Sequence, residues 1–227
     1  TFVCSDDRFP ARKAFVSELV HRHPDIHTIV LNVNRRQTSV VLGQEERILY
    51  GPGIITDELL GHTFALSASS FYQINHRQCE RLYAQAYALL QPTEDMRVLD
   101  AYCGIGTIGL GIAGSIRALT GVEINEQAVK NARENARRNQ IRNARFICAD
   151  ATRFIMAESQ RHAHYDAIIL DPPRDGSTPA FLDACAALQP ERIIYISCNP
   201  LTQIRDLRYI MAKGYRCSDM YLFDMFP

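Results

Sequence analysis

A cysteine stands where a predicted strand must end. The run "RIIYIS", residues 192–197, is typical of a β-strand, and Cys198 is followed directly by Asn199 and Pro200. Proline has no backbone N–H and cannot extend a strand, so Cys198 is predicted at the strand's carboxyl end. A lone cysteine is most often a small buried hydrophobe. At the rim of a sheet, however, a thiol can act as a nucleophile.

Acidic side chains end four earlier predicted strands. They are Asp100, Glu123, Asp150 and Asp171. The carboxyl ends of parallel strands meet at one edge of an α/β sheet, so these acids are predicted to share a rim with Cys198. A carboxylate at Glu123 suits the two hydroxyls of a ribose, and Asp150 is placed to accept from an adenine amino group. Asp171 is followed by two prolines, which hold the backbone rigid.

A glycine-rich turn follows the strand that ends at Asp100. Gly104, Gly106 and Gly109 give the spacing G-x-G-x-x-G at the start of a predicted helix. Such a turn brings backbone N–H groups close to a ligand, although the same pattern is about as typical of a tight strand-to-helix connection, and it also fits a dinucleotide. A carboxylate at Asp100 would repel phosphate but suits the sulfonium and amino groups of S-adenosylmethionine. The sequence therefore favours S-adenosylmethionine as the cofactor.

Composition narrows the class of protein. The chain has 227 residues, zero formal net charge and no long apolar run, which predicts a cytoplasmic globular protein without a membrane partner. Seven scattered cysteines without a C-x-x-C pair predict reduced thiols and no metal site. Residues 117–145 hold seven basic and three acidic side chains, which fits an RNA-facing surface but is more common in a solvated helix.

The order of elements predicts an α/β fold. From residue 76 onward strands and helices alternate, which predicts a doubly wound, Rossmann-like sheet of five parallel strands with an edge strand over 215–227. Residues 1–66 are expected to form part of a smaller, mostly antiparallel α+β domain, in which "TSVVLG" at 38–43 is a strand and 11–24 a helix. Residues 67–227 are then the second domain.

Five motifs in order carry a family resemblance. "SFYQIN", "LDAYCGIGTIGL", "DPPR", "SCNP" and "LFDMFP", within residues 60–227, resemble the RNA 5-methyluridine methyltransferase family. The resemblance implies methyl transfer from S-adenosylmethionine to carbon 5 of a uridine, after Cys198 adds to carbon 6. It assigns to the cofactor Gln73, Tyr102, Thr107, Glu123, Asp150 and Asp171. It assigns to the RNA substrate Phe71, Asp171 and Arg174.

The motifs also favour a subfamily and show departures from it. "LDAYCGIG" and "DPPRDG" are closer to the enzymes of 23S ribosomal RNA than to those of the transfer RNA T-loop, which stay the alternative. Family members carry an amino-terminal β-barrel, many carry a four-cysteine iron–sulfur site, and their proton-abstracting glutamate follows "DMFP". None of these is in this sequence. We therefore expect a fragment, inactive alone, of a protein that is monomeric at full length.

Two other readings compete with this one. Amino-group methyltransferases with an N/D-P-P-Y/F motif place an aromatic residue after the two prolines, whereas this chain has Arg174 there and would leave Cys198 without a role. An RNA-binding or RNA-folding module without turnover is the second alternative. A methyl-transfer assay on RNA containing uridine separates the two.

Overall fold

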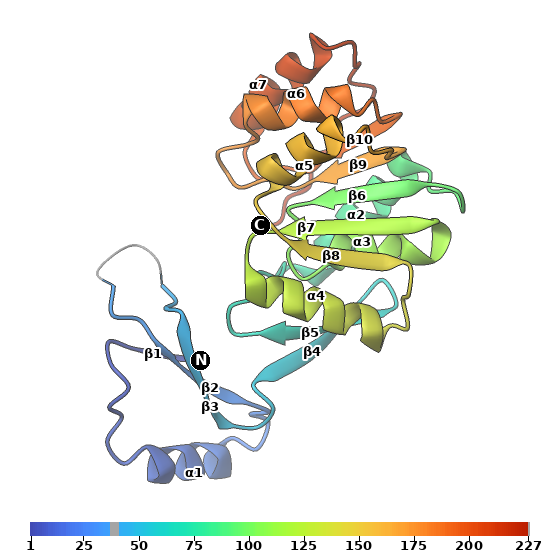
Figure 1. Cartoon of the computed structure of the whole chain (residues 1–227). Coiled ribbons are helices and arrows are strands. Elements are labelled where there is room, and N and C mark those ends of the chain that lie inside the picture. The colour runs from blue at the N-terminus through green and yellow to red at the C-terminus, as the bar shows by residue number, and fades with distance from the viewer. Residues whose placement is uncertain (37–40, 227) are drawn as a thin grey trace. The chain divides into compact units, whose positions relative to one another are not determined.

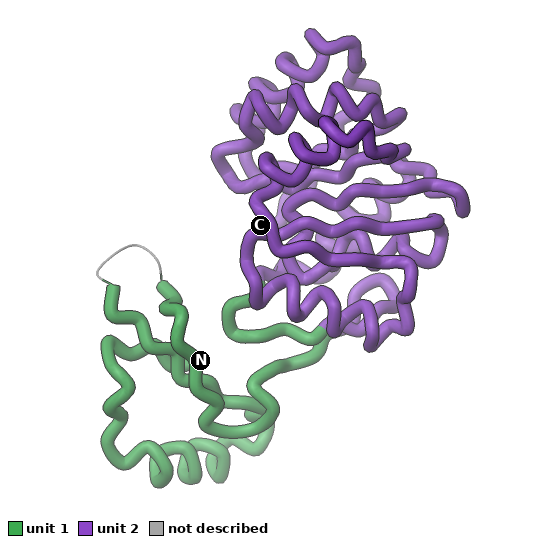
Figure 2. Tube along the Cα trace, viewed as in Figure 1, with its two compact units in different colours: residues 1–57, 65–70 green, residues 58–64, 71–227 purple. Residues whose placement is uncertain are grey.

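The computed structural model describes residues 1–36 and 41–226 and forms two compact units (Figures 1 and 2). One unit comprises residues 1–57 and 65–70, and the other comprises residues 58–64 and 71–227. Strands β4 (Ile54–Leu59) and β5 (His62–Ser67) pair with each other and contribute to both units. The domain boundary that the sequence suggests between residues 66 and 67 stays a prediction.

The first unit contains a three-stranded sheet in the order β1-β2-β3. Its elements are β1 (Phe2–Cys4), α1 (Arg12–Arg22), β2 (Ile29–Val33) and β3 (Glu45–Tyr50). Strands β2 and β3 are antiparallel, as expected, but β1 runs parallel to β2, because α1 provides the crossover that parallel neighbours need. Of the strand predicted at 38–43, residues 38–40 lie outside the described residues, and 41–43 are not in a strand.

The second unit is built on a five-stranded sheet whose strands are all parallel. In spatial order these are β10 (Arg192–Tyr195), β9 (Ala167–Leu170), β6 (Arg97–Ala101), β7 (Ala118–Glu123) and β8 (Ala144–Cys148). This confirms the predicted parallel sheet. The chain order reverses between β6 and β9, and the crevice outside such a switch point is where α/β sheets bind ligands.

Helices cover both faces of this sheet (Figure 1). One face packs against α5 (Ala151–Gln160), α6 (Pro179–Ala187) and α7 (Pro200–Met211). Alternate strand residues such as Leu99 and Leu170 bury against Phe181 of α6 there. The remaining helices of this unit are α2 (His76–Leu90), α3 (Thr107–Ile112), the short 3-10 turn η1 (Ala113–Ser115) and α4 (Glu126–Arg138).

Of the strand predicted for residues 215–227, residue 227 lies outside the described residues, and residues 215–226 do not form a strand. Residues 215–226 have no regular secondary structure, and most of their side chains are exposed. The prediction was wrong because an extended segment becomes a strand only when a neighbour pairs with its backbone, and among the described residues the outer edge of β10 has no such neighbour. The segment instead lines a cavity of about 700 Å³ together with β10, α2 and α7.

Candidate functional site

The sheet register aligns three of the predicted site residues. Ala101 of β6 pairs with Leu170 of β9 on one side and with Val122 of β7 on the other. The next residue on each strand is Tyr102, Asp171 and Glu123, respectively. Neighbouring strands lie about 4.8 Å apart, so these three positions form one row across the switch point. We call Asp171, Tyr102 and Glu123 the strand-end row.

The loop after β6 turns through an unusual backbone conformation. Tyr102, Gly104 and Gly106 have φ angles of 64°, 55° and 86°. Glycine adopts such angles without strain, whereas a tyrosine does not, so the surrounding structure must hold Tyr102 in place. The N–H of Cys103 donates to the carbonyl of Val122 over 3.0 Å, which anchors the loop to β7.

Glu123 fixes the same loop from the neighbouring strand. Its Oε2 accepts from the N–H of Gly104 at 3.1 Å, and its Oε1 accepts from the N–H of Asn125 at 2.8 Å. Each carboxylate oxygen can accept a further hydrogen bond. The Glu123 carboxylate can therefore shape the loop and still receive the hydroxyl groups of a ligand.

Asp100 lies beneath the loop and not on the open rim where the sequence placed it. Its side chain is 0% exposed, and its Oδ2 accepts from the N–H of Gly109 at 2.9 Å. A Cβ at Gly109 would come within 2.7 Å of that oxygen, so the third glycine is required by packing rather than by a phosphate. Burial raises the pKa of Asp100 to about 7. Its Oδ1 is buried without a hydrogen-bond partner among the described residues.

Carboxyl groups concentrate negative charge at this edge. Burial raises the pKa of Asp171 to about 6. After burial itself, the charges of Asp171 and Glu123 contribute to the raised pKa of Asp100. A cation bound here would favour the ionised form of these acids. This charge distribution fits the positively charged methionine part of S-adenosylmethionine and opposes a phosphate.

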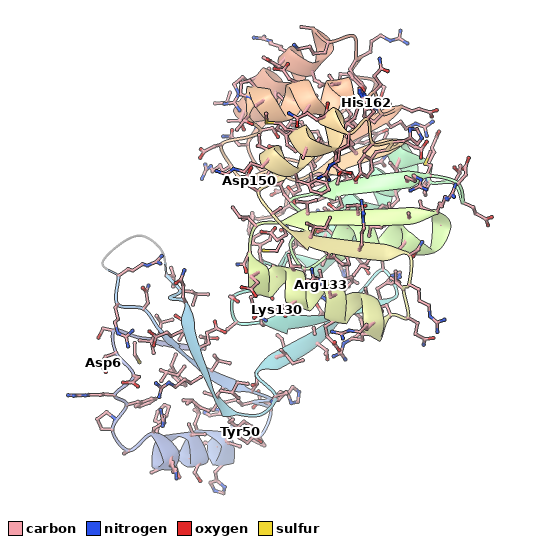
Figure 3. All side chains as sticks on the ribbon, in the orientation of Figure 1. Asp6, Tyr50, Lys130, Arg133, Asp150 and His162 are labelled. Atoms are coloured by element: carbon pink, nitrogen blue, oxygen red, sulfur yellow. The ribbon has the colours of Figure 1, made fainter. Side chains whose placement is uncertain are left out.

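Other predicted cofactor residues border the strand-end row. Asp150 is exposed and caps α5 by accepting from the N–H of Arg153 at 2.9 Å. Figure 3 shows Asp150 and His162 at opposite ends of α5, which places Asp150 at the carboxyl edge of the sheet. Thr107 begins α3, and its Oγ1 lies 3.3 Å from the hydroxyl of Tyr83. The ring of Tyr102 packs against Phe181 with 5.6 Å between ring centroids.

Cys198 is exposed in a tight turn between β10 and α7. The hydroxyl of Ser197 donates to the carbonyl of Asn199 and accepts from its N–H, both at 3.1 Å. The Asn199 side chain then caps α7 by accepting from the N–H of Leu201 at 3.2 Å. Pro200 is the first residue of the helix, where its missing N–H costs nothing.

The structure separates the seven free thiols by burial. Burial raises the pKa of Cys79 to about 11 and of Cys185 to about 12, and it raises the pKa of Cys103 as well. Thiolates form poorly at such sites. Cys148 and Cys217 are exposed like Cys198, but they do not follow a strand into the turn that contacts the "DPPR" loop.

The turn at Cys198 is bonded to the loop that carries Asp171. The Asn199 Nδ2 and the Thr202 hydroxyl donate to the carbonyl of Arg174, at 3.1 and 3.2 Å. The "DPPR" and "SCNP" motifs therefore form one hydrogen-bonded assembly, although they lie more than twenty residues apart in the sequence. Arg174 itself is exposed.

Phe71 and Gln73 lie in the loop before α2. Phe71 is 76% exposed, and Gln73 is partly buried. Asn75 caps α2 and donates from Nδ2 to the carbonyl of Met225 at 3.2 Å. This bond links the "SFYQIN" motif, which contains Phe71 and Gln73, to the "LFDMFP" motif.

Sequence reasoning missed two sets of supporting residues. Tyr83 and Tyr87 of α2 reach α3, where the Tyr87 hydroxyl donates to the carbonyl of Ile108 at 2.9 Å. Their spacing of four residues, on a helix that buries Tyr83, was the available signal. The second is Asp206 of α7, whose burial no sequence pattern revealed.

The basic segment at 117–145 is largely satisfied within the protein. On α4, Arg133 donates to the carbonyl of Phe146, and Lys130 pairs with Glu126 at 2.8 Å (Figure 3). Arg137 pairs with Glu134 at 3.0 Å. These partners favour the solvated-helix interpretation over an RNA-facing surface.

Membrane-spanning helices and metal-binding clusters are both absent from the described residues. Among them, no helix is long and apolar enough to cross a bilayer. Nor do their histidine, cysteine and acidic side chains gather in groups of three or more that could hold a metal ion.

Comparison with known proteins identifies relatives of this chain. It is 38% identical over 226 residues to an uncharacterized RNA methyltransferase of Staphylococcus aureus, which covers 100% of this chain and 50% of that protein. It is 40% identical over 213 residues to another from Streptococcus pyogenes, covering 93% of this chain and 46% of that protein. The chain thus spans about half the length of the curated relatives it matches.

A solved structure agrees with these relatives. The chain superimposes on the tRNA (uracil-54, C5)-methyltransferase of Pyrococcus abyssi, solved with S-adenosyl-L-homocysteine, with a TM-score of 0.77 and 29% identity. The match covers 99% of this chain and 52% of that one. Residues 57–227 match the model of the tRNA (uracil-5-)-methyltransferase family, which confirms the resemblance seen in the motifs. With three quarters of its length matched in this way, the chain belongs to the tRNA (uracil-5-)-methyltransferase family.

Proposed function

We propose that this protein transfers a methyl group from S-adenosylmethionine to carbon 5 of a uridine in RNA, and that its substrate is 23S ribosomal RNA. The observation that carries the proposal is the bonded assembly of the Cys198 turn with the Asp171 loop, beside the strand-end row. A nucleophile and a cation-binding edge then serve one reaction centre. Family membership supports the same reaction.

The carboxyl edge supplies groups that fit the cofactor. Glu123 offers acceptors for the ribose hydroxyls, and Asp150 offers one for the adenine amino group. Tyr102 and Thr107 border the glycine loop, and Asp171 lies next to Tyr102 in the row. We include Gln73 in this set on the family resemblance. When bound, S-adenosylmethionine supplies an electrophilic methyl group.

Cys198 activates the uracil ring. Its thiolate adds to carbon 6, and the electron pair of the carbon 5–carbon 6 double bond moves toward the carbonyl oxygen, which gives an enolate nucleophilic at carbon 5. After carbon 5 has taken the methyl group, loss of its proton to a base expels the thiolate and restores the double bond. We assign this proton transfer to no described side chain.

Asp171 can assist on the substrate side as well. Its raised pKa of about 6 leaves a fraction of the carboxyl protonated near neutral pH, so it can donate to or accept from the uracil edge. We place Phe71 and Arg174 at the RNA, because both side chains are exposed and Arg174 adjoins the Cys198 turn. A guanidinium there can pair with phosphate.

A uridine of the transfer RNA T-loop is the second candidate substrate. The match to the Pyrococcus abyssi enzyme over 99% of this chain favours it. The closeness of "LDAYCGIG" and "DPPRDG" to the ribosomal members favours 23S RNA. The seven unpaired thiols support a reducing, cytoplasmic location for either reaction.

A methylation assay tests the proposal and its substrate. Protein in its full natural length is incubated with tritiated S-adenosylmethionine and either 23S or transfer RNA transcripts, and methylated nucleosides are identified by mass spectrometry. We expect 5-methyluridine in 23S RNA. Label confined to transfer RNA would move the assignment to the second candidate. Label on an exocyclic amino group, or none on either RNA, would contradict the proposed reaction.

A further inference from the structure

Asp206 of α7 is a buried carboxylate that the proposed chemistry does not use. Its side chain is 2% exposed, and it lies eight residues after Cys198 on the helix that follows the thiol. Its Oδ2 accepts from the backbone N–H of Ser177 at 2.7 Å and from the hydroxyl of Tyr195 at 2.7 Å. Its Oδ1 accepts from Nε of Arg205 at 2.8 Å. Buried charges are kept only when they are paired in this way.

These bonds join two segments of the site. Tyr195 is the last residue of β10, three residues before Cys198. Ser177 lies in the loop that begins at Asp171, two residues before α6 begins at Pro179. A single carboxylate oxygen therefore binds both the strand that leads to the thiol and the loop that carries the acid. Burial first, and then the bond to Asp206, raises the pKa of Tyr195, which keeps its hydroxyl a donor.

Asp206 is tightly packed against the loop that begins at Asp171. A Cβ at Gly176 would come within 2.5 Å of the Asp206 Oδ2. Gly176 has a φ of 79°, and its N–H donates to the carbonyl of Pro173 at 2.8 Å, so the loop turns tightly over the carboxylate. Arg205 adds a further hydrogen bond to the same loop, donating from Nη2 to the carbonyl of Asp175 at 2.9 Å.

We propose that Asp206 is a positioning residue that fixes the Asp171 loop relative to the Cys198 turn, so that the carboxylate and the thiol act on the same uracil. The inference rests on the proposed function. Asp206 touches neither substrate nor cofactor in this account. It acts through Tyr195 on one side and through the backbone of Ser177 on the other.

Misplacement of one reacting group by about 1 Å can cost a hundredfold in rate. Weakening the hydrogen bonds of Asp206 should therefore slow methyl transfer. It should not make the thiol itself less reactive, because Cys198 is exposed in its own turn. This separates a positioning role from a merely stabilising one. A stabilising residue would affect the unfolding temperature and leave the rate of the folded enzyme unchanged.

The chain offers a matched control on the neighbouring helix. Asp183 of α6 also accepts from a tyrosine hydroxyl, that of Tyr209 at 3.1 Å, and pairs with Lys213 at 2.7 Å. It is exposed, and its partners carry no site residue. The test pairs are Tyr195→Phe with Tyr209→Phe, and Asp206→Asn with Asp183→Asn.

The experiment measures single-turnover methylation of 23S RNA by the protein in its full natural length, below the unfolding temperature of every variant. Alkylation of Cys198 by iodoacetamide is measured in parallel. We expect Tyr195→Phe to slow methylation several-fold and Asp206→Asn at least tenfold, with alkylation within twofold of wild type. Both controls should methylate within twofold of wild type. Equal rates in Tyr195→Phe and Tyr209→Phe would overturn the proposal, even if Asp206→Asn fails to fold.

Amide hydrogen exchange decides the matter independently of activity. The Ser177 N–H should exchange faster in Tyr195→Phe than in Tyr209→Phe, because the Asp206 carboxylate that accepts from it has lost its hydrogen bond to the Tyr195 hydroxyl. Unchanged exchange would overturn the proposal. If the wild-type protein methylates no uridine, the proposed function fails, and the exchange result still shows whether Asp206 fixes the loop.

Discussion

Two turns carry the residues of the proposed site, and they are held by different means. The loop after β6 is shaped by its backbone, with left-handed φ angles at Tyr102, Gly104 and Gly106, and the Glu123 carboxylate accepts from its Gly104 N–H. The turn after β10 is held by side chains of the helix that follows it. A loop that must approach a ligand closely benefits from small residues. A nucleophile needs a fixed orientation, which side chains from a rigid helix can provide.

The largest expected effect concerns the charge beneath the backbone-shaped loop. Asp100 has a pKa of about 7 in the folded protein, above the value of about 3.9 expected when the chain is unfolded. The folded state therefore binds this proton more tightly, and the resulting stability is present below about pH 4 and lost as pH rises through 7. Ionisation should cost up to about 4 kcal/mol.

Urea unfolding of wild type and Asp100→Asn at several pH values between about 4 and 8 measures this cost. The substitution removes the titrating group, so the wild type should lose stability relative to the variant as pH rises. Parallel stability curves for the two proteins would show that Asp100 does not titrate in this range.

Removal of Glu123 tests whether the same loop serves the cofactor. Glu123→Ala takes away the acceptor for the Gly104 N–H and the proposed partner of the ribose hydroxyls. We expect affinity for S-adenosylhomocysteine to fall by about 1.5–3 kcal/mol in calorimetry. Glu134→Ala, on the exposed side of α4, is the control. Unchanged affinity in Glu123→Ala would exclude the ribose assignment.

Gly109 tests the packing beneath the loop. Its Cβ would meet Asp100 Oδ2 at 2.7 Å and Leu119 at 2.8 Å, so Gly109→Ala should lower the free energy of unfolding by about 1–3 kcal/mol. At Gly114 a Cβ would meet nothing within 4 Å, and Gly114→Ala should stay within about 0.5 kcal/mol of wild type. Equal unfolding free energies for the two variants would refute the packing role.

The smallest effect on stability is expected in the turn held by side chains. Asn199→Ala removes the cap of α7, and Asn125→Ala removes the cap of α4. Each should cost about 1 kcal/mol in thermal unfolding. Of these two asparagines, only Asn199 also donates to the Arg174 carbonyl, so only Asn199→Ala should slow methyl transfer. A comparable slowing in Asn125→Ala would argue against a special role for the Cys198 turn.

The sheet could be predicted from the sequence because its strands carry strong local signals. Each parallel strand is a short apolar run that ends in a polar residue or a turn, as in "AIILDPP". Positions at strand ends follow from the topology, which is why Asp171 and Glu123 could be placed on one edge, whereas Tyr102 was assigned only through the family resemblance.

The parts that could not be predicted depend on contacts between distant segments. Residues 215–226 have the composition of a strand, but pairing requires a neighbour that local sequence does not specify. Asp100 ends a predicted strand as the other acids do, but its burial under α3 depends on how the helix packs. Asp206 is an ordinary polar residue of a helix until Tyr195 and Ser177 are brought to it.

The identity of the nucleophile is tested most directly by trapping it. Protein in its full natural length is incubated with RNA containing 5-fluorouridine and S-adenosylmethionine, and the denaturation-resistant adduct is digested and mapped by mass spectrometry. Fluorine replaces the proton at carbon 5, so elimination stops and the bond to the thiol persists. We predict a methylated fluorouracil on the peptide that carries Cys198, and none in Cys198→Ala. An adduct on Cys148 or Cys217, or undiminished methylation of uridine by Cys198→Ala, would contradict the account.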